Sequence, residues 1–243
     1  MLDIIQFEDI KRYKRYISFD VNTNSRLYYD KDLIHKIFLY KTKDFDTILM
    51  KLDELKLEEL VELRRLIFKN EFMVGYSIKK YKKYKSLNKF KNREFELKKE
   101  DCYKVVKAFD KLLKNNLSYV DFTTSNILLN KNTGNIKICD LDSLILNNSK
   151  LDEKSGLKNL LILILTYLYN INRRDIRNVI TAGKNIEGTF IEECQISDNM
   201  ITIDHLNNVI EHMKEEYIKK EKKLIIDKSW ELINTGYPKF FIN

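Results

Sequence analysis

The sequence predicts an α+β fold in two lobes, a small β-rich N-terminal lobe and a larger helical C-terminal lobe. Short β-branched and aromatic runs separated by polar turns fill the first 80 residues, whereas apolar residues at helical spacing dominate the rest. In addition, 44% of the 243 residues are hydrophobic and 12% are aromatic, which is enough to build a buried core. We expect residues 1–78 to form the first lobe and residues 79–243 the second.

Two hairpins with a helix between them are predicted in the first lobe. Residues 25–29 and 33–39 are rich in β-branched and aromatic side chains and flank a polar turn, which favours antiparallel strands. Residues 65–68 and 72–78 flank a second polar turn in the same way. Between the hairpins, residues 44–57 place apolar side chains three and four positions apart, and this spacing predicts one buried helical face.

The second lobe is predicted to be mainly helical. The expected helices span residues 103–117, 157–169, 175–182, 204–223 and 227–234. One passage differs, because residues 126–129 and 136–139 have the character of short strands around a polar turn. Such a hairpin would bring Asp121, which precedes it, and Asp140, which follows it, to one end of the ladder.

Composition and charge limit the possible partners and compartments. The 44 Lys and Arg residues exceed the 36 Asp and Glu residues, and the net charge of +8 is compatible with anionic ligands such as nucleotides. Three widely spaced cysteines match neither a disulfide framework nor a metal cluster. The N-terminus lacks a signal-peptide pattern, and the apolar stretch 160–169 is too short to cross a membrane. We therefore expect a cytoplasmic protein without a transmembrane segment.

The residues that carry chemistry surround the short central hairpin, in the segment 119–142. Asp121 and Asn126 are separated by four residues and followed by an apolar strand, and Asp140 ends the next strand. This pattern resembles the catalytic loop and metal-binding segment of the protein-kinase-like phosphotransferases. With Lys36 on the upstream hairpin, the resemblance covers roughly the first 170 residues. It implies a bilobal protein-kinase-like fold with nucleotide between the lobes, in a divergent bacterial- or viral-type member.

The resemblance also implies a role for each of these side chains. Lys36 would reach the α- and β-phosphates of ATP, and Asp140 and Asn126 would hold Mg²⁺ through their oxygens. Asp121 would orient the acceptor hydroxyl, on a protein or a small molecule, and receive its proton. Asp142 stands where the family has a glycine and could add a further metal ligand. ATP and Mg²⁺ are thus the implied cofactors.

The family usually pairs this lysine with an acidic residue from the following helix. Asp46, Asp53 and Glu54 are candidates for that partner, and Glu54 is our choice for the nucleotide site. The alternative for Glu54 is an ordinary surface carboxylate.

Several positions depart from the family pattern. No glycine occurs before Gly75, so the glycine-rich loop is missing, and residues 19–24 would have to supply backbone donors in its place. Tyr119 replaces the usual histidine, and Thr123 stands where serine/threonine kinases often carry a lysine. These departures leave open a second interpretation, a pseudokinase that binds nucleotide or a partner without turnover.

The segment after Asp140 is also reduced. Only 15 residues separate Asp140 from Gly156, too few for the family's activation and peptide-docking region. Gly156 itself falls where the family often has a helix-starting Asp that supports the catalytic loop.

A basic segment, Lys79 to Arg93, offers a third interpretation. It holds eight basic residues and no acidic one, with Tyr81, Tyr84 and Phe90 interleaved, which is compatible with gripping phosphates and stacking on nucleic-acid bases. A charge run of this kind is more often a solvated connector. We therefore expect a lobe connector whose aromatic residues pack at the lobe junction, rather than a nucleic-acid site.

Overall fold

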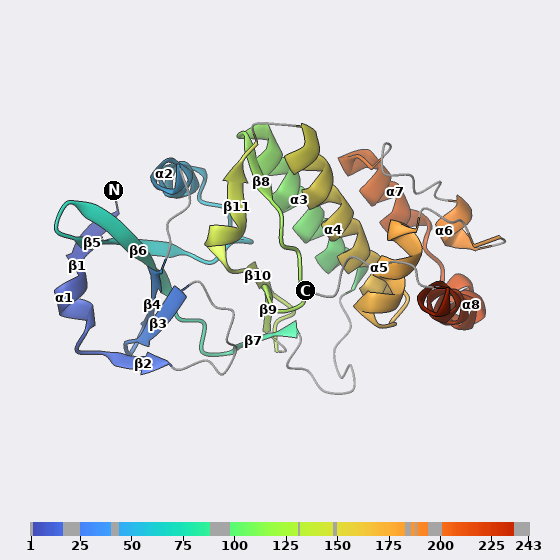
Figure 1. Cartoon of the computed structure of the whole chain (residues 1–243), viewed down its shortest axis with the longest axis horizontal. Helices are drawn as coiled ribbons and strands as arrows, with labels where there is room; N and C mark the ends of the chain where they lie inside the picture. Colours follow the sequence, from blue (N-terminus) through green and yellow to red (C-terminus); the bar gives the residue numbers. More distant parts are fainter. Residues whose placement is uncertain are drawn as a thin grey trace.

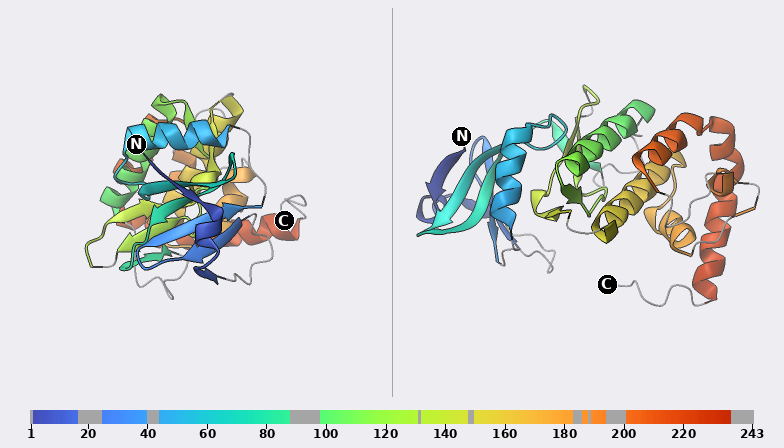
Figure 2. Two further views of the ribbon diagram at one scale, coloured as in Figure 1. Left: turned by 90° about the vertical axis from the view of Figure 1, so that its left-hand side faces the viewer. Right: turned by 90° about the horizontal axis from the view of Figure 1, so that it is seen from above.

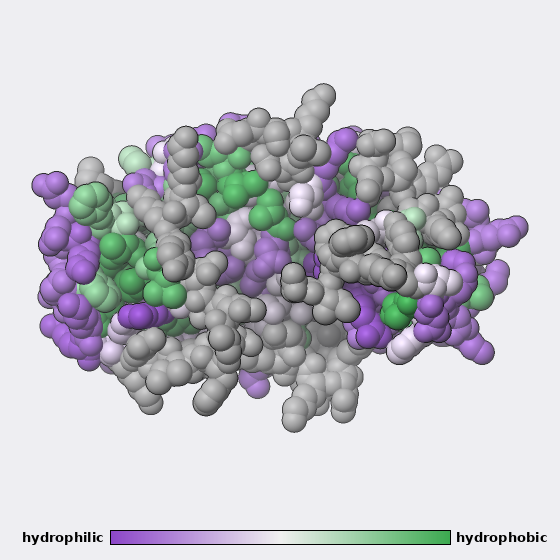
Figure 3. Space-filling model, in the orientation of Figure 1, coloured by the Kyte–Doolittle hydropathy of each residue, from purple (hydrophilic) through white to green (hydrophobic). Residues whose placement is uncertain are grey.

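The molecule has a β-rich end and a helical end, as Figures 1 and 2 show. The computed structural model describes residues 2–16, 25–39, 44–87, 98–130, 132–147, 150–182, 186–187, 189–193 and 201–235. Within these residues the predicted α+β architecture in two lobes is confirmed. Hydrophilic residues dominate the surface at both ends of the face drawn in Figure 3.

A six-stranded sheet with the order β1-β5-β6-β4-β3-β2 forms the first lobe. Its strands are β1 (Asp3–Gln6), β2 (Lys14–Tyr16), β3 (Ser25–Tyr29), β4 (Leu33–Phe38), β5 (Leu63–Lys69) and β6 (Phe72–Lys79). Both predicted hairpins are confirmed, as the antiparallel pairs β3–β4 and β5–β6. The parallel edge strand β1, the one-turn helix α1 (Phe7–Ile10) and β2 were not predicted, because elements of three or four residues carry almost no periodic signal.

The two faces of this sheet have different partners. Side chains alternate along a strand, so β4 directs His35 to the outer face and Lys36 to the inner face. The outer face packs beneath α1, where Ile10 is fully buried. The inner face packs against α2 (Phe45–Leu55), whose Phe45 ring lies 5.0 Å from the ring of Phe38 on β4. Lys36 therefore leaves the sheet on the side of α2 and the second lobe.

The described part of the second lobe contains the helices α3 (Lys99–Lys114), α4 (Lys150–Leu168), α5 (Arg173–Thr181), α6 (Phe190–Glu193), α7 (Ile203–His212) and α8 (Glu215–Asn234). The apolar part of α4 is buried on all sides, as its composition predicted. The predicted helix over 204–223 is wrong, because α7 ends at His212 and α8 continues through 227–234 as one helix. The break occurs at Met213, whose buried side chain turns into the core while its backbone is extended.

Two small sheets lie between the sheet lobe and the helices. The predicted central hairpin is confirmed as β9 (Ile127–Asn130) and β10 (Ile136–Ile138), and β7 (Tyr84–Ser86), from the basic segment, pairs with β9. An unpredicted antiparallel pair joins β8 (Leu117–Tyr119) to β11 (Leu144–Leu146). This second pair brings together the two ends of the segment 120–143, which carries all the predicted catalytic-loop residues.

Among the described residues, no helix combines the length and the apolar composition needed to cross a lipid bilayer.

Candidate active site

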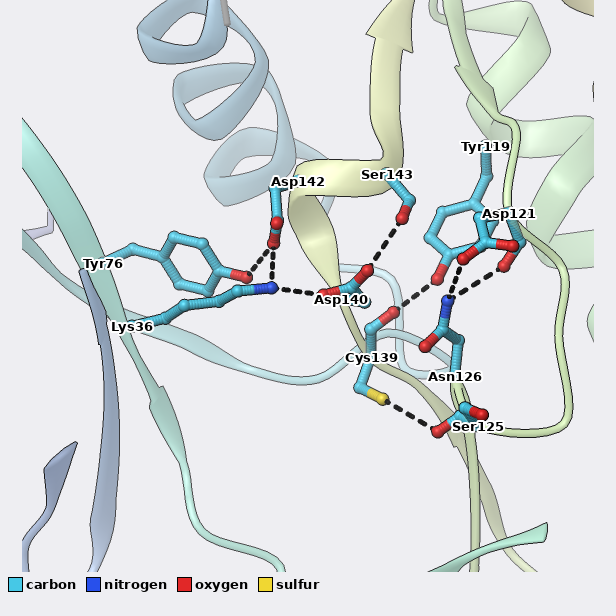
Figure 4. A network of polar contacts seen from close by, with 10 residues as sticks. All are labelled: Lys36, Tyr76, Tyr119, Asp121, Ser125, Asn126, Cys139, Asp140, Asp142 and Ser143. Atoms are coloured by element: carbon cyan, nitrogen blue, oxygen red, sulfur yellow. Dashed lines mark hydrogen bonds and ion pairs between the residues drawn. The ribbon is translucent and has the colours of Figure 1, made fainter. Parts of the chain in front are cut away.

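Lys36 contacts two carboxylates from the other lobe, as Figure 4 shows. Its ammonium group donates to a carboxylate oxygen of Asp140 and, at 2.5 Å, to Oδ1 of Asp142. The lysine comes from β4, whereas both acids follow β10, on the short 3-10 helix η3 (Leu141–Ser143) and the residue before it. The structure therefore brings together three of the residues that the sequence selected, from positions more than 100 apart in the chain.

Asp140 sits in an unusual backbone conformation that neighbouring groups hold in place. Its φ and ψ angles of 65° and 59° lie in the left-handed region, which Asp tolerates better than most residues. The Ser143 hydroxyl donates to Oδ2 of Asp140 at 2.8 Å. The Tyr119 hydroxyl donates to the carbonyl of Cys139 at 2.6 Å, and the Cys139 N–H donates to the carbonyl of Asn126 at 2.8 Å. These bonds fix the residue before Asp140 as well as its carboxylate.

Asp121 and Asn126 form a second pair beside the first. The Asn126 side-chain amide donates to Oδ2 of Asp121 at 2.9 Å and to the Asp121 carbonyl at 3.0 Å. Because both bonds use the amide nitrogen, the amide oxygen of Asn126 points away from Asp121, as Figure 4 shows. The pair thus presents an amide oxygen turned away from Asp121 and one oriented carboxylate.

The loop that carries Asp121 is supported from the helices by two residues that the sequence did not reveal. The Asn159 amide, on α4, donates to the carbonyl of Val120 at 2.8 Å. The Arg173 guanidinium, at the start of α5, donates to the carbonyl of Phe122 and, at 3.3 Å, to Oδ1 of Asn159. A polar residue in the most apolar helix was the available signal for Asn159, whereas Arg173 gave none because it lies 52 positions from Asp121.

Gly156 explains how α4 comes close enough to give this support. A Cβ atom at this position would lie 2.7 Å from Cζ of Phe109 and 2.9 Å from the Tyr119 carbonyl oxygen. The helix axis therefore approaches β8 at a distance that only glycine permits here.

The environment favours the charged forms of both Lys36 and Asp140. Burial disfavours the ammonium form of Lys36, but attraction to Asp142 and Asp140 and hydrogen bonds to both outweigh it, so the pKa of Lys36 lies above its usual value. Burial likewise opposes ionisation of Asp140, yet the attraction and hydrogen bond of Lys36 keep the pKa of Asp140 below its usual value.

Asp121 is shifted in the opposite direction. Burial raises the pKa of Asp121, and the nearby charge of Asp140 adds to the increase. The hydrogen bond from Asn126 and the positive charge of Arg173 lower the pKa, but by less than burial raises it. A carboxylate whose pKa is moved toward neutrality is a stronger proton acceptor than a solvated one.

Tyr76 is a further site residue that the sequence did not select. Its hydroxyl, on β6, donates to Oδ1 of Asp142 at 2.9 Å, and its side chain is 1% exposed. Burial raises the pKa of Tyr76 well above its usual value, so the hydroxyl remains a donor. An aromatic residue within a strand normally indicates core packing, which is why this contact was not predicted.

The structure does not bring Glu54 to Lys36. Glu54 is exposed on α2, because the helix turns the face carrying Ile48 and Leu52 into the core and leaves position 54 on the outside. Of the other two candidates, Asp46 is also exposed and Asp53 is partly buried. Among the described residues, the ion-pair partners of Lys36 are Asp140 and Asp142, so the sequence-based choice of a helix acid is corrected.

The donor set fits a hard divalent cation held jointly with a ligand. Carboxylate and amide oxygens of Asp140 and Asn126 are the donors that Mg²⁺ prefers. No group of three or more His, Cys, Asp or Glu side chains suited to a metal occurs in the part of the chain that the structure describes. Protein sites for Mg²⁺ often have one or two carboxylates and take the remaining ligands from substrate phosphates and water, and this arrangement matches such a site.

The basic segment is described only in part. Tyr81 lies at the lobe junction, where its hydroxyl oxygen accepts the N–H of Glu62 at 3.0 Å and its ring meets that of Tyr84 at 5.1 Å. Phe90 lies outside the described residues, as do residues 19–24, which would replace the glycine-rich loop.

No protein-family model and no curated protein sequence matches the chain. A search of solved structures finds similarity to the Cydia pomonella granulovirus kinase PK-1, with a TM-score of 0.54 and 13% sequence identity. The match covers 82% of this chain and 94% of that chain. This likeness concerns the fold, and it agrees with the sheet lobe, the helical lobe and their order: the chain has a bilobal, protein-kinase-like fold.

Proposed function

We propose that this chain is an ATP- and Mg²⁺-dependent phosphotransferase of the protein-kinase-like superfamily, acting on a hydroxyl group of a protein or a small molecule. The observation that carries the proposal is the contact between Lys36 and Asp140 across the lobes, with the hydrogen-bonded pair of Asp121 and Asn126 beside it. A cation, metal-binding oxygens and an oriented carboxylate are the parts that phosphoryl transfer requires, because the protein's main task is to position groups and neutralise charge.

Each residue has a defined task in this proposal. Lys36 binds the α- and β-phosphates, while Asp140 and the amide oxygen of Asn126 would hold Mg²⁺, which would supply positive charge to neutralise the phosphates. Asp121 accepts the proton of the acceptor hydroxyl as the oxygen–phosphorus bond forms and the bond to ADP breaks. The Asn126 amide keeps Asp121 oriented, and burial makes Asp121 a better proton acceptor.

Transfer of label from γ-labelled ATP tests the proposal. The full chain with Mg²⁺ and panels of protein and small-molecule acceptors should transfer label or phosphorylate itself. Asp140→Asn should reduce the rate at least a hundredfold, whereas Asp227→Asn, an exposed position on α8, should leave it unchanged. Equal rates for the chain and for Asp140→Asn would contradict the proposal.

A pseudokinase is the second candidate, and a specific observation favours it. Lys36 is already neutralised by two carboxylates, and no glycine-rich loop precedes it to hold phosphates. A chain of this kind would bind ATP without turnover, and ATP at a hundred times its dissociation constant would stabilise it by about 2.7 kcal/mol. Thermal unfolding with and without ATP, run beside the transfer assay, separates the two candidates.

A further inference from the structure

Lys36 has two acidic partners, and they are held in different ways. Asp140 uses one carboxylate oxygen for Lys36 and the other for Ser143. Asp142 places a single oxygen, Oδ1, between two donors that both come from the sheet, the Lys36 ammonium at 2.5 Å and the Tyr76 hydroxyl at 2.9 Å. Figure 4 shows both donors converging on this one carboxylate.

We propose that Asp142 and Tyr76 form a built-in anchor that positions Lys36, in place of an acid from helix α2. The proposal rests on the proposed function and deepens it: Asp140 would be the residue that holds the metal, whereas Asp142 keeps Lys36 aimed at the phosphates. Asp142 is then a positioning residue for the lysine and not a metal ligand.

The register of the sheet supports this assignment. Lys36 on β4 lies directly opposite Tyr76 on β6, so the two side chains leave adjacent strands on the same face. Gly75 allows these strands to pack closely, because a Cβ atom there would lie 2.1 Å from the carbonyl oxygen of Lys36. The pairing of β4 with β6 therefore sets the spacing between the Lys36 ammonium and the Tyr76 hydroxyl.

The packing around the two anchoring residues supports it as well. The Tyr76 ring packs against the rings of both Phe38 and Phe45, whose centres lie 5.7 Å and 6.0 Å away. Asp142 is fixed by its neighbour Leu141, which is 1% exposed in the core. A buried phenol and a pinned backbone make a rigid support for an ammonium group on a flexible side chain.

Helix α2 contributes packing to this arrangement, and among the described residues the ion-pair partners of Lys36 come from outside this helix. Phe45 touches the anchor through Tyr76, whereas Glu54 is exposed and Asp46, one position after Phe45, is also exposed. The position of Lys36 should therefore be independent of any movement of the acidic side chains of α2. Once the contact with Asp140 is removed, loss of Asp142 or Tyr76 should release the lysine, and loss of Glu54 should not.

Nuclear magnetic resonance of the lysine ammonium groups tests the anchor without requiring activity. In the full chain labelled with ¹⁵N-lysine, a held ammonium group exchanges protons slowly and gives a resolved signal, which Lys36→Arg assigns to Lys36. Because Asp140 also contacts Lys36 in the unliganded chain, these variants are compared in an Asp140→Asn background. There, Asp142→Asn should abolish this signal and Tyr76→Phe should weaken it, while Glu54→Gln should leave it intact. A signal that survives Asp142→Asn, or that disappears in Glu54→Gln, overturns the proposal. If Asp142→Asn fails to fold, the pair Tyr76→Phe and Glu54→Gln still decides.

Kinetics then separates an anchor from a metal ligand. An anchor predicts that Asp142→Asn raises KM for ATP at least tenfold while the Mg²⁺ concentration giving half-maximal rate stays within twofold. A rise in the Mg²⁺ requirement with unchanged KM for ATP would assign Asp142 to the metal and overturn the proposal. Absence of transfer by the unmodified chain would refute the proposed function and leave the resonance experiment to judge the anchor on its own.

Discussion

At the scale of single residues, the environment of Asp121 is set by two side chains that lie far from it in the sequence. Asn159 holds the carbonyl on one side of Asp121, and Arg173 holds the carbonyl on the other. Arg173 also brings a positive charge close to the carboxylate, which lowers a pKa that burial has raised. The pKa of the Asp121 carboxyl group is therefore lowered by a residue of α5, a helix that contributes no residue to the predicted motif.

Arg173→Gln should shift the pH dependence of phosphoryl transfer. Removing the guanidinium leaves burial and Asp140 to act on Asp121, so its pKa rises further above the usual value. Since the base must be ionised, the acidic limb of the pH–rate profile should move to higher pH. Arg174→Gln, the neighbouring position whose guanidinium lies over the Trp230 ring, is the control and should leave the limb in place. A limb that moves equally in both variants would show that the effect is not specific to Arg173.

His35 makes the stability of the first lobe depend on pH. The imidazole is fully buried, its Nδ1 lies 2.8 Å from the Ser77 hydroxyl, and its ring stacks on Tyr13. Burial is the main cause that lowers the pKa of His35 below its usual value of 6.5, and the charge of Arg65 acts in the same direction, against the opposing charge of Asp30. As the pH falls, the unfolded chain therefore takes up a proton on His35 at a higher pH than the folded chain does.

The contribution of neutral His35 should be complete above pH 6.5 and should be lost as the pH falls toward the lower pKa of the folded state. The free energy of unfolding, measured by denaturant titration from pH 8 to pH 5, should fall in this range. His35→Gln should show a shallower decrease than the unmodified chain, and identical slopes would contradict the assignment to His35.

At the scale of elements, the contact between α4 and β8 determines where the loop bearing Asp121 begins. Gly156→Ala would normally favour a helix by up to about 1 kcal/mol. Here the added Cβ atom would meet the Tyr119 carbonyl and the Ser118 hydroxyl at 2.9 Å, and a backbone carbonyl held in a strand cannot give way easily. We expect a net loss of about 1–3 kcal/mol in the free energy of unfolding. Ser155→Ala, one residue away and exposed, is the matched control, and equal effects would refute the packing argument.

Sequence patterns predicted some of the helices and strands and missed others. Both hairpins of the first lobe and the central hairpin β9–β10 were predicted from short strand-like runs around a polar turn, and α2 was predicted from its helical spacing of apolar residues. The pair β8–β11 was not, since three-residue strands have no period and their pairing depends on contacts more than 20 residues apart. The break between α7 and α8 was missed because Met213 is helix-compatible by type and leaves the helix only to reach the core.

The candidate site was predicted to a similar degree. The resemblance to the kinase-like motif selected Asp121, Asn126 and Asp140, with Lys36 on the upstream hairpin, and the structure brings these four residues together. The acid beside the lysine was chosen incorrectly, since Glu54 points outward and Asp142 takes that place. The spacing of a motif records positions along one segment, whereas the partner of Lys36 is decided by how two lobes meet.

At the scale of the whole molecule, the ion pairs of Lys36 connect the lobes directly. Lys36→Met should leave Asp140 and Asp142 as neighbouring carboxylates without their cation. The acids remain partly accessible to water, so we expect a loss of about 1–2 kcal/mol in the free energy of unfolding, less than for a fully buried pair. Lys82→Met removes an exposed ion pair with Asp32 and should cost less than about 1 kcal/mol. Equal losses in a denaturant titration would contradict a role for Lys36 in joining the lobes.

The pairing of β8 with β11 has a consequence for how this chain can vary. The segment 120–143 connects these two strands, which meet where Tyr119 pairs with Leu144, and it contains the β9–β10 hairpin. Insertions or deletions in the turn of that hairpin would change the length of the segment but not the pairing of β8 with β11. Asp121 and Asp142, each two positions from the paired strands, can therefore keep their spacing while the turn varies in length and composition.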